Sequence, residues 1–597
     1  MFRGQSAAGN RADEALQAGE TMVQKTSAGQ RKRILLSGVF GPFGVDDDFG
    51  RRENIMELFH NQVTREQGLA SFRFQHRSFG LYFLAENVDA DVTVLDFPTK
   101  EHFERELRNG YDIVGISFIA PNFVKAREMA RLVRRHAPEA VVVLGGHGAA
   151  IEGVEQLIDC DHVIRGEGVA WLRRFLGQNP DAPILHPVLP STERQSILGL
   201  PLPGVCSSLL VPGLGCVNGC RFCSTTHFFG KTYTSYLATG RAIFENAVRI
   251  ADERGTDAFF VMDENFLKDT RRARELLARM EREQRFFKFQ IFSSAEAIMA
   301  FGLDELVRLG VTFIWMGVET KSREANFTKN AGVDPQWLVR ELRERGINVL
   351  VSGILCMEHH TQENIQEDID HLIDLEADFS QFMLLTPLPT TALYQEKKAS
   401  GALREDLPYE EWHGQKMLNY DHPHFPGDAA ERWIRQAFRQ EYAENSSSIL
   451  RVTETALRGY LHLARLERRD ACLEARLAQA RERAAEYALI LPVIERHAVN
   501  TLERERAVDL TRRMTEALGK PGLREKALHL GVRILAARWR WRVWWFGDAI
   551  QPKTLVTHYP AGRGALGVAQ PADSPRPEVR EMHEARQLPQ AAAVGVN

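Results

Sequence analysis

Apolar runs of strand length alternate with longer charged stretches in the middle of the chain. Six such runs occur, at residues 207–212, 257–261, 287–292, 312–316, 347–354 and 379–385. The charged stretches between them, such as residues 270–285 and 336–345, have the length and polarity of exposed helices. Strands that alternate with helices pair in parallel, so this part of the chain predicts a sheet built from βαβ units.

A second alternating pattern precedes the first. Its apolar runs lie at residues 33–37, 91–96, 111–117, 140–144 and 162–164. A helix with an Arg/Lys-rich face is expected at residues 124–136. The alternation predicts a doubly wound α/β sheet, which binds ligands at the carboxyl ends of its strands. The first run is not followed by G-x-G-x-x-G, the usual dinucleotide-binding sequence.

Changes in composition divide the chain further. Charge-dense, helix-like sequence follows the second group of strands, and both ends are polar and poor in apolar residues. The expected organisation is a disordered start (1–30), a doubly wound domain (31–190), a βα domain (200–400), a helical region (401–560) and a disordered tail (561–597).

Composition favours an enzyme of a reducing compartment. The chain has 597 residues, a formal net charge of −4 and seven cysteines, too few for a disulfide scaffold of this length. The charge gives no reason to expect a nucleic-acid partner. Residues 1–30 lack the apolar core of a signal peptide, and no apolar stretch has the length of a membrane span. We therefore expect a cytoplasmic protein.

Three cysteines follow the first strand of the βα domain. Cys216, Cys220 and Cys223 have the spacing C-x3-C-x2-C. A cubane iron–sulfur cluster usually takes four thiolates, so three would leave one iron open to an outside ligand. Two other interpretations remain open: a zinc site closed by His227, and chemically inert thiols.

The cysteine motif, with Phe222 before its last cysteine, resembles the radical S-adenosylmethionine (SAM) superfamily. The resemblance implies a partial (β/α)6 barrel and a 4Fe-4S cluster whose open iron binds SAM. It also implies an external electron donor, such as flavodoxin or ferredoxin, and cleavage of SAM to a 5′-deoxyadenosyl radical.

The same resemblance implies SAM contacts at the ends of the barrel strands. The candidate residues are Phe222, Asp263, Glu264, Ser293 and Glu319. For each loop residue the alternative is a solvated acid or a helix cap. Two places depart from the family pattern: residues 353–361 lack the usual Gly-x-Pro-x-Glu-Thr, and Thr390 replaces a glycine.

The amino-terminal domain resembles the cobalamin-binding domain that precedes the barrel in one branch of this superfamily. The candidate cobalamin contacts are Ser117, Gly145, Gly146, His147, Gly166 and Glu167. Asp-x-His-x-x-Gly is missing, which suggests cobalamin without a histidine beneath the cobalt. His147 is a candidate ligand or a residue that caps a turn. A domain that has lost its cobalamin is a further alternative.

Two other features have an open interpretation. Cys356, at the end of the fifth barrel strand, is a weak catalytic candidate as an acid or radical quencher, or else a buried spectator. The segment from Trp539 to Phe546 alternates Arg with aromatic residues. It suggests a peripheral membrane contact, an apolar substrate surface, or a helix that packs its tryptophans on the protein.

The resemblance predicts a cobalamin-dependent radical SAM enzyme, and most simply a methyltransferase. One SAM would supply a methyl group through cobalamin, and a second would give the radical that activates an unreactive carbon of a small-molecule or lipid substrate. Relatives with the same domains also form, contract or join carbon skeletons. A non-catalytic iron–sulfur or zinc protein is the alternative of another class.

Overall fold

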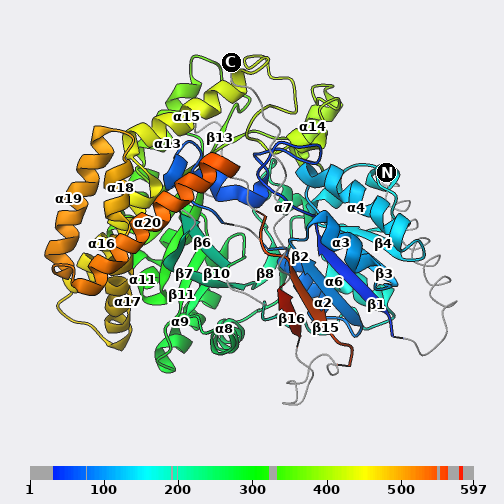
Figure 1. The fold of residues 1–597 in the computed structure, drawn as a ribbon, viewed down its shortest axis with the longest axis horizontal. Coiled ribbons are helices and arrows are strands. Elements are labelled where there is room, and N and C mark those ends of the chain that lie inside the picture. Colours follow the sequence, from blue (N-terminus) through cyan, green and yellow to red (C-terminus); the bar gives the residue numbers. More distant parts are fainter. Residues whose placement is uncertain are drawn as a thin grey trace, which may run out of the picture. The chain divides into compact units, whose positions relative to one another are not determined.

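The computed structural model describes residues 31–74, 77–189, 193–197, 200–321, 332–547, 551–562 and 577–581 (Figure 1). Residues 1–30 and most of residues 561–597, both predicted to be disordered, lie outside the described residues. The chain forms two compact units. The first consists of Met1–Gly41, Arg77–Pro190 and Gln551–Gln587, and the second of Pro42–His76, Ser191–Ile550 and Leu588–Asn597.

The first unit contains a seven-stranded sheet in the order β16-β15-β2-β1-β3-β4-β5. Its strands are β1 (Arg33–Gly38), β2 (Asp91–Asp96), β3 (Ile113–Ser117), β4 (Val141–Gly145), β5 (His162–Val163), β15 (Leu555–Tyr559) and β16 (Glu578–Glu581). Its helices are α2 (Phe79–Glu86), α3 (Lys100–Leu107), α4 (Phe123–His136), α5 (Val154–Leu157) and α6 (Gly168–Phe175). The strands β1 to β5 are parallel, which confirms the doubly wound α/β domain.

The parallel strands are buried on both faces, as their continuous apolar runs predicted. Ile34, Val92, Val114 and Val142 have no exposed surface. The chain order reverses at β1, which lies between β2 and β3. In doubly wound sheets the ligand site lies at the carboxyl ends of the strands beside such a reversal.

The carboxyl-terminal segment differs from the expectation. Within the region expected to be helical, Leu555–Tyr559 forms β15 and pairs antiparallel with β2, and β16 extends this edge from inside the predicted disordered tail. Gln551 Nε2 and Thr554 Oγ1 also donate hydrogen bonds to the Phe97 carbonyl, at 3.1 and 3.0 Å. Sequence pattern did not reveal this strand because its partner lies more than 450 residues away.

The second unit contains a sheet in the order β14-β13-β12-β11-β10-β7-β6. Its strands are β6 (Glu193–Ile197), β7 (Leu200–Leu210), β10 (Ala258–Val261), β11 (Lys288–Phe292), β12 (Val311–Glu319), β13 (Asn348–Leu355) and β14 (Phe379–Leu384). The six strands from β7 to β14 are parallel and coincide with the six predicted runs, and β6 adds an antiparallel edge. The sheet order is linear, as expected for a partial barrel.

Helices connect the barrel strands, and a helical region follows them. The connecting helices are α7 (Ser224–Phe228), α8 (Gly240–Arg254), α9 (Thr270–Arg282), α10 (Ala295–Phe301), α11 (Leu303–Leu309), α12 (Pro335–Glu344), α13 (Ile365–Asp374) and α14 (Ala392–Ala399). The later helices are α15 (Ala429–Asn445), α16 (Ser448–Ala464), α17 (Ala471–Ala488), α18 (Leu491–His497), α19 (Thr501–Leu518) and α20 (Leu523–Phe546).

Residues 42–76 belong to the second unit rather than to the contiguous domain 31–190. Phe59 and Phe72 pack edge-on against Phe379 of β14, with ring centroids 5.5 and 5.0 Å apart. They share one buried cluster with residues of α16 to α19. Burial of these aromatic rings explains why the segment leaves the doubly wound sheet.

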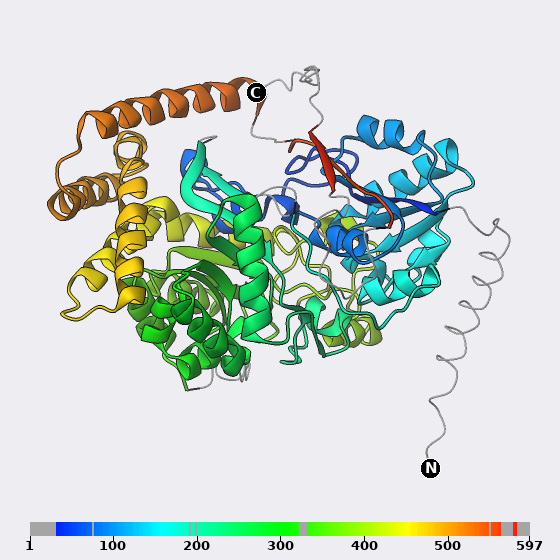
Figure 2. The same cartoon turned by 90° about the horizontal axis from the view of Figure 1, so that it is seen from below.

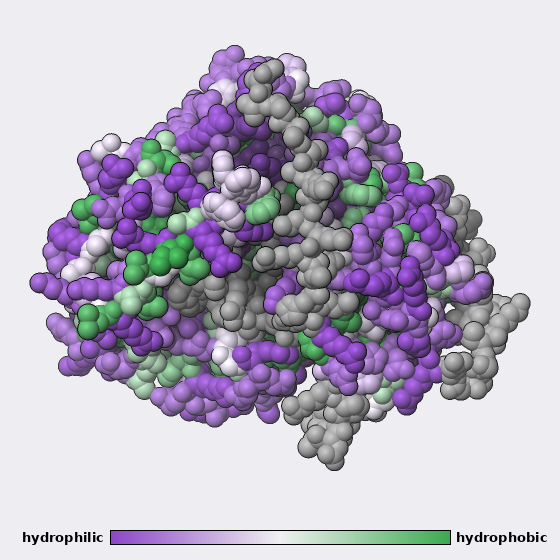
Figure 3. All heavy atoms as spheres, in the orientation of Figure 1, coloured by the Kyte–Doolittle hydropathy of each residue, from purple (hydrophilic) through white to green (hydrophobic). Residues whose placement is uncertain are grey.

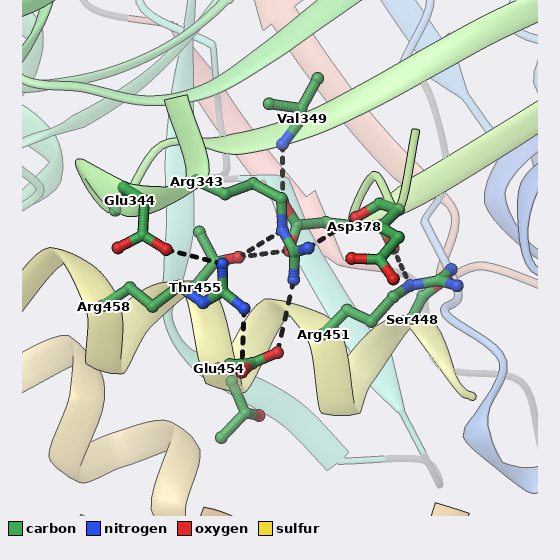
Figure 4. A network of polar contacts seen from close by, with 12 residues as sticks. Arg343, Glu344, Val349, Asp378, Ser448, Arg451, Glu454, Thr455 and Arg458 are labelled. Atoms are coloured by element: carbon green, nitrogen blue, oxygen red, sulfur yellow. Dashed lines mark hydrogen bonds and ion pairs between the residues drawn. The ribbon is translucent and has the colours of Figure 1, made fainter. Parts of the chain in front are cut away.

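A buried polar network joins the helical region to the barrel (Figure 4). Asp378 lies just before β14 and has no exposed surface. Its carboxylate accepts hydrogen bonds from Val349 N–H at 2.8 Å and from Thr455 Oγ1 of α16 at 2.6 Å. Arg343 of α12 forms an ion pair with the same carboxylate at 3.4 Å. The network therefore fixes α16 against the starts of β13 and β14.

The last helix, α20, lies along the edge of the second unit (Figure 2). It contacts α18, and Ala536 and Trp539 join the core cluster beneath it. Among the helices that the structure describes, none combines the length and the hydropathy that a membrane crossing requires.

Candidate functional site

The three cysteines lie in one loop between the hairpin strand β8 (Gly213–Gly215) and α7. All three are reduced and partly exposed. Gly215 begins the loop with φ = +90°, and a Cβ there would lie 2.3 Å from the Thr232 carbonyl oxygen. Only glycine fits this position, so the tight turn into the cysteines depends on it.

A single zinc ion would require its ligand atoms to lie close together. Tetrahedral zinc holds thiolate sulfurs about 3.8 Å apart, since each Zn–S bond is about 2.3 Å. Among the described residues, one trio of His, Cys, Asp or Glu has all its ligand atoms within 4.8 Å of one another, and it is not the cysteine trio. The described cysteines do not form such a compact group, and the cluster interpretation rests on their C-x3-C-x2-C motif.

Asp263, at the end of β10, is engaged within the protein. Its Oδ2 accepts hydrogen bonds from Arg272 Nη2 at 2.7 Å and from Tyr233 Oη at 2.6 Å. Arg272 also donates to Tyr233 Oη at 2.7 Å. Tyr233 belongs to β9 (Tyr233–Ser235), which pairs with β8 next to the cysteines. This triad therefore holds the cysteine hairpin to the barrel, and the sequence pattern did not predict its members Tyr233 and Arg272.

Glu264, the next residue, is open to solvent instead. Although the side chain reaches the surface, the protein packed around it removes water from its carboxyl, and this desolvation, followed by the charge of Asp263, raises its pKa to about 7. Burial, and then the charges of Cys223 and Glu264, raise the pKa of the Cys216 thiol. Glu264 is therefore the acid beside the cysteine loop that has a side chain available to a ligand.

Substitution of the two neighbouring acids should have different effects. Asp263→Asn leaves the buried Arg272 without its counter-charge, so we expect lower stability by about 3 kcal/mol and poorer iron retention. Glu264→Gln should preserve stability and weaken SAM binding about tenfold, through loss of one charge-assisted hydrogen bond. Thermal unfolding and equilibrium dialysis of SAM measure the two effects. If Asp263→Asn bound SAM more weakly while its stability was unchanged, the structural role of Asp263 and the SAM-binding role of Glu264 would be contradicted.

Ser293 lies at the end of β11 and joins a second polar group. Asn265 Oδ1 accepts hydrogen bonds from Ser293 Oγ and from Ser294 N–H, both at 3.2 Å. Asn265 Nδ2 donates to Ser294 Oγ at 2.9 Å. Asn265 stands in the same turn as Glu264 but was not among the predicted site residues. The group fixes the ends of β10 and β11 relative to each other.

Glu319 is the last residue of β12, and its backbone conformation needs stabilising contacts from the residues around it. The residue is buried and has φ = +71°, a conformation unfavourable for a residue with a side chain. The following turn is held by Asp368, which accepts from Thr320 Oγ1 and Lys321 N–H, both at 2.6 Å. His360 Nε2 lies 2.5 Å from the same carboxylate.

His359, His360 and Asp368 form the described trio whose possible metal-ligand atoms all lie within 4.8 Å of one another. His360 Nδ1 accepts a hydrogen bond from Met357 N–H at 2.9 Å, so the ring proton lies on Nε2 and points at Asp368. A metal ion at Nε2 would require that proton to leave. The trio therefore supports the Glu319 turn rather than a cation.

Cys356 is fully buried at φ = +54°, and burial raises the pKa of its thiol well above the usual range. Its carbonyl accepts a hydrogen bond from Tyr420 Oη at 2.7 Å. Glu358, two residues later, is partly exposed and pairs with Arg221 of the cysteine loop at 2.6 Å. Arg221 follows Cys220 directly and was not singled out by the sequence. This geometry agrees with the spectator interpretation of Cys356.

In the first unit, four of the predicted cobalamin contacts lie together. Ser117 of β3 pairs in register with Gly145 of β4, and Gly146 and His147 follow immediately. An added Cβ on Gly146 would lie 2.6 Å from the Phe118 carbonyl oxygen, whereas one on Gly145 would meet no described atom within 4 Å. The open space at Gly145 fits the close approach of a flat corrin ring.

The environments of His147, Gly166 and Glu167 determine how available these predicted contacts are to a ligand. Burial lowers the pKa of His147 to about 4, so its imidazole is neutral at pH 7. Gly166 follows β5 with φ = +89°. The Glu167 carboxylate caps α6 by accepting from Val169 N–H at 2.7 Å and Ala170 N–H at 2.9 Å. Glu167 thus has a structural role that the sequence did not reveal.

Substitutions of Gly145 and Gly146 should have different effects on cobalamin affinity and on protein stability. We expect Gly145→Ala to leave thermal unfolding unchanged and to weaken cobalamin binding, because its methyl group fills the open space. Gly146→Ala should lower stability by about 1–3 kcal/mol, because the position has φ = +80° and a backbone oxygen in contact. Spectroscopic titration with hydroxocobalamin measures the affinity. Unchanged affinity in Gly145→Ala would place the corrin elsewhere.

Comparison with known proteins agrees with this arrangement. Residues 68–176 match the family model of the B12 binding domain, and residues 210–372 match that of the Radical SAM superfamily. An uncharacterized methyltransferase of Pyrococcus horikoshii is 23% identical over 325 residues, which cover 49% of this chain and 70% of that protein. The bacteriochlorophyllide d C-12(1)-methyltransferase of Chlorobaculum tepidum is 26% identical over 332 residues, covering 52% of this chain and 70% of the relative.

A solved structure has the same fold. It is the radical S-adenosylmethionine methyltransferase TsrM of Kitasatospora setae, with cobalamin and a 4Fe-4S cluster bound. The match has a TM-score of 0.50 at 15% identity, over 76% of this chain and 100% of that chain. The chain therefore combines a B12-binding domain with a radical SAM domain that carries the cysteine loop, and these two domains imply cobalamin, SAM and a 4Fe-4S cluster as cofactors.

Proposed function

We propose that this enzyme transfers a methyl group to an unactivated carbon of an apolar or lipid substrate. The observation that carries the proposal is the cysteine loop at the carboxyl end of the barrel strands, in a chain that also has a B12-binding domain and methyltransferase relatives. The bound cofactors supply a carbon-centred radical and an activated methyl group, chemistry that no amino-acid side chain provides.

The residues of the chain bind and orient these cofactors. Cys216, Cys220 and Cys223 would hold the cluster, and the Asp263–Arg272–Tyr233 triad keeps their hairpin in place. Glu264 would receive the ammonium group of SAM, since its carboxyl is open to solvent beside the cysteines. The Glu319 turn, supported by Asp368, would provide a second contact.

Three further parts of the proposal concern partners. An external one-electron donor, such as flavodoxin or ferredoxin, reduces the cluster. The substrate is apolar because the carboxyl-terminal helix exposes several tryptophans. The same helix, from Trp539 to Phe546, brings the enzyme to a membrane surface where such a substrate would be found.

The test is anaerobic reconstitution of the full chain with iron, sulfide and cobalamin, followed by reaction with SAM that carries a deuterated methyl group and a bacterial lipid extract. Methyl transfer predicts both 5′-deoxyadenosine and S-adenosylhomocysteine, and a lipid that carries the label. Production of 5′-deoxyadenosine alone would instead indicate ring formation, rearrangement or carbon joining. Failure to cleave SAM in fully reconstituted enzyme would refute the proposal.

A further inference from the structure

The helix α20 has one apolar face that packs on the protein. Val532, Ala536 and Trp539 are spaced by four and three residues and therefore share one side of the helix. Ala536 is buried, and Val532 and Trp539 pack on the core cluster of the second unit. The Arg542 guanidinium lies over the Trp539 ring, 4.8 Å from its centroid. This face anchors the helix and explains part of its tryptophan content.

A second apolar face of α20 points away from the second unit. Its residues recur at intervals of seven and four, namely Leu523, Leu530, Ile534, Trp541 and Trp545. Successive helical residues are about 100° apart, so this stripe lies on the side opposite Ala536. Its side chains are exposed, Ile534 by 59%, Trp541 by 58% and Trp545 by 56%. Figure 3 shows hydrophobic residues surrounded by hydrophilic ones along the course of α20.

Exposure of so much apolar surface needs an explanation. Single exposed apolar residues are common, but a contiguous stripe marks an interaction surface. Trp544 next to it is 75% exposed, and Phe546 at the helix end is 51% exposed. Removal of these large apolar side chains from water is favourable, so a partner that covers the stripe would bind with a substantial gain in free energy.

Basic residues border the outer stripe on both sides. Lys526, Arg533 and Arg540 are spaced by seven residues along one border. Arg524 and Arg538 follow the other border. The helix has six basic residues and one acidic residue, in a chain whose formal net charge is −4. The positive charge is therefore concentrated beside the exposed tryptophans.

We propose that α20 docks on the surface of a bilayer that contains anionic lipids. The outer stripe lies at the boundary between headgroups and acyl chains, where the amphipathic tryptophan ring is favourable, and both basic borders contact lipid phosphates. A second copy of the chain is a poorer partner, because two such helices would place like charges together. The inference extends the membrane contact included in the proposed function, and requires neither SAM cleavage nor methyl transfer.

The experiment measures flotation of the full chain with vesicles of phosphatidylcholine alone or mixed with phosphatidylglycerol. We expect binding to the mixed vesicles that weakens with salt, and a blue shift of tryptophan fluorescence on binding. Trp541→Ala/Trp545→Ala should lower the partition coefficient about tenfold or more. Arg533→Ala/Arg540→Ala should lower it by a similar factor.

The matched control variants remove exposed apolar or basic side chains from helices other than α20. Leu157 is 46% exposed on α5, and Arg241 and Arg282 are exposed on α8 and α9. Leu157→Ala and Arg241→Ala/Arg282→Ala should bind vesicles like the parent chain. SAM cleavage by the parent chain without vesicles tests the proposed chemistry by itself, so the docking inference and the proposed chemistry fail separately.

Three results would overturn the inference. The first is no binding to the anionic vesicles. The second is binding that the α20 substitutions leave unchanged. The third is a doubled mass in solution that the tryptophan substitutions return to that of one chain, because a second copy would then cover the stripe.

Discussion

Cys220→Ala should abolish SAM cleavage, with a loss of at least about a thousandfold, while cobalamin binding remains at the parental level. The cluster would lose one of its three protein ligands, whereas the predicted cobalamin contacts lie in the other compact unit. Iron and sulfide content, release of 5′-deoxyadenosine and cobalamin titration of the same preparation test the three parts of this expectation.

Cys160→Ala is the matched control. Cys160 is also a reduced, partly exposed cysteine, but it belongs to the first unit. Its removal should change neither iron content nor SAM cleavage. If Cys220→Ala cleaved SAM at the parental rate, or if Cys160→Ala lost its iron to the same extent, the assignment of the cluster to this loop would be wrong.

Asp378→Ala should destabilise the second unit by about 3–5 kcal/mol. The substitution leaves the buried Arg343 without the carboxylate 3.4 Å away and removes the acceptor for Val349 N–H. It also breaks the contact with Thr455 that attaches α16 to the barrel. Urea unfolding, with hydrogen exchange of the amides in β13 and α16, measures the loss and its location.

Glu344→Ala is the control for this network. Glu344 pairs with Arg458 at 2.8 Å, but its side chain is 50% exposed, so its loss should change stability by less than about 1 kcal/mol. If Asp378→Ala and Glu344→Ala lowered the free energy of unfolding equally, the greater contribution assigned to the buried ion pair would be contradicted. A selective loss of protection in α16 would show that the network holds the helical region to the barrel.

Local patterns in the sequence predicted most of the fold. All six parallel barrel strands and the five parallel strands of the first unit lie where apolar runs of strand length occur. Such runs are informative because a strand in a parallel sheet is buried on both faces, which its own sequence must reflect. The C-x3-C-x2-C spacing is local in the same sense, and the family models confirm the class of protein it indicated.

Other features depend on residues that are distant in sequence. Strand β15 pairs with β2, and the aromatic residues of 42–76 pack on β14, so neither partner is visible in the local pattern. The two adjacent acids Asp263 and Glu264 look equivalent in the sequence. Their different environments arise because Arg272 and Tyr233 reach one carboxylate and leave the other to solvent.

The sequence by itself therefore determined the parallel strands and the domain types and predicted the three cysteines as ligands, because these features depend on short-range spacing and burial. Only the tertiary structure decided which acid is a structural anchor, how the tail completes the first sheet, and which tryptophans of α20 face outward. Those outcomes depend on contacts between distant segments, which no local pattern of residues records.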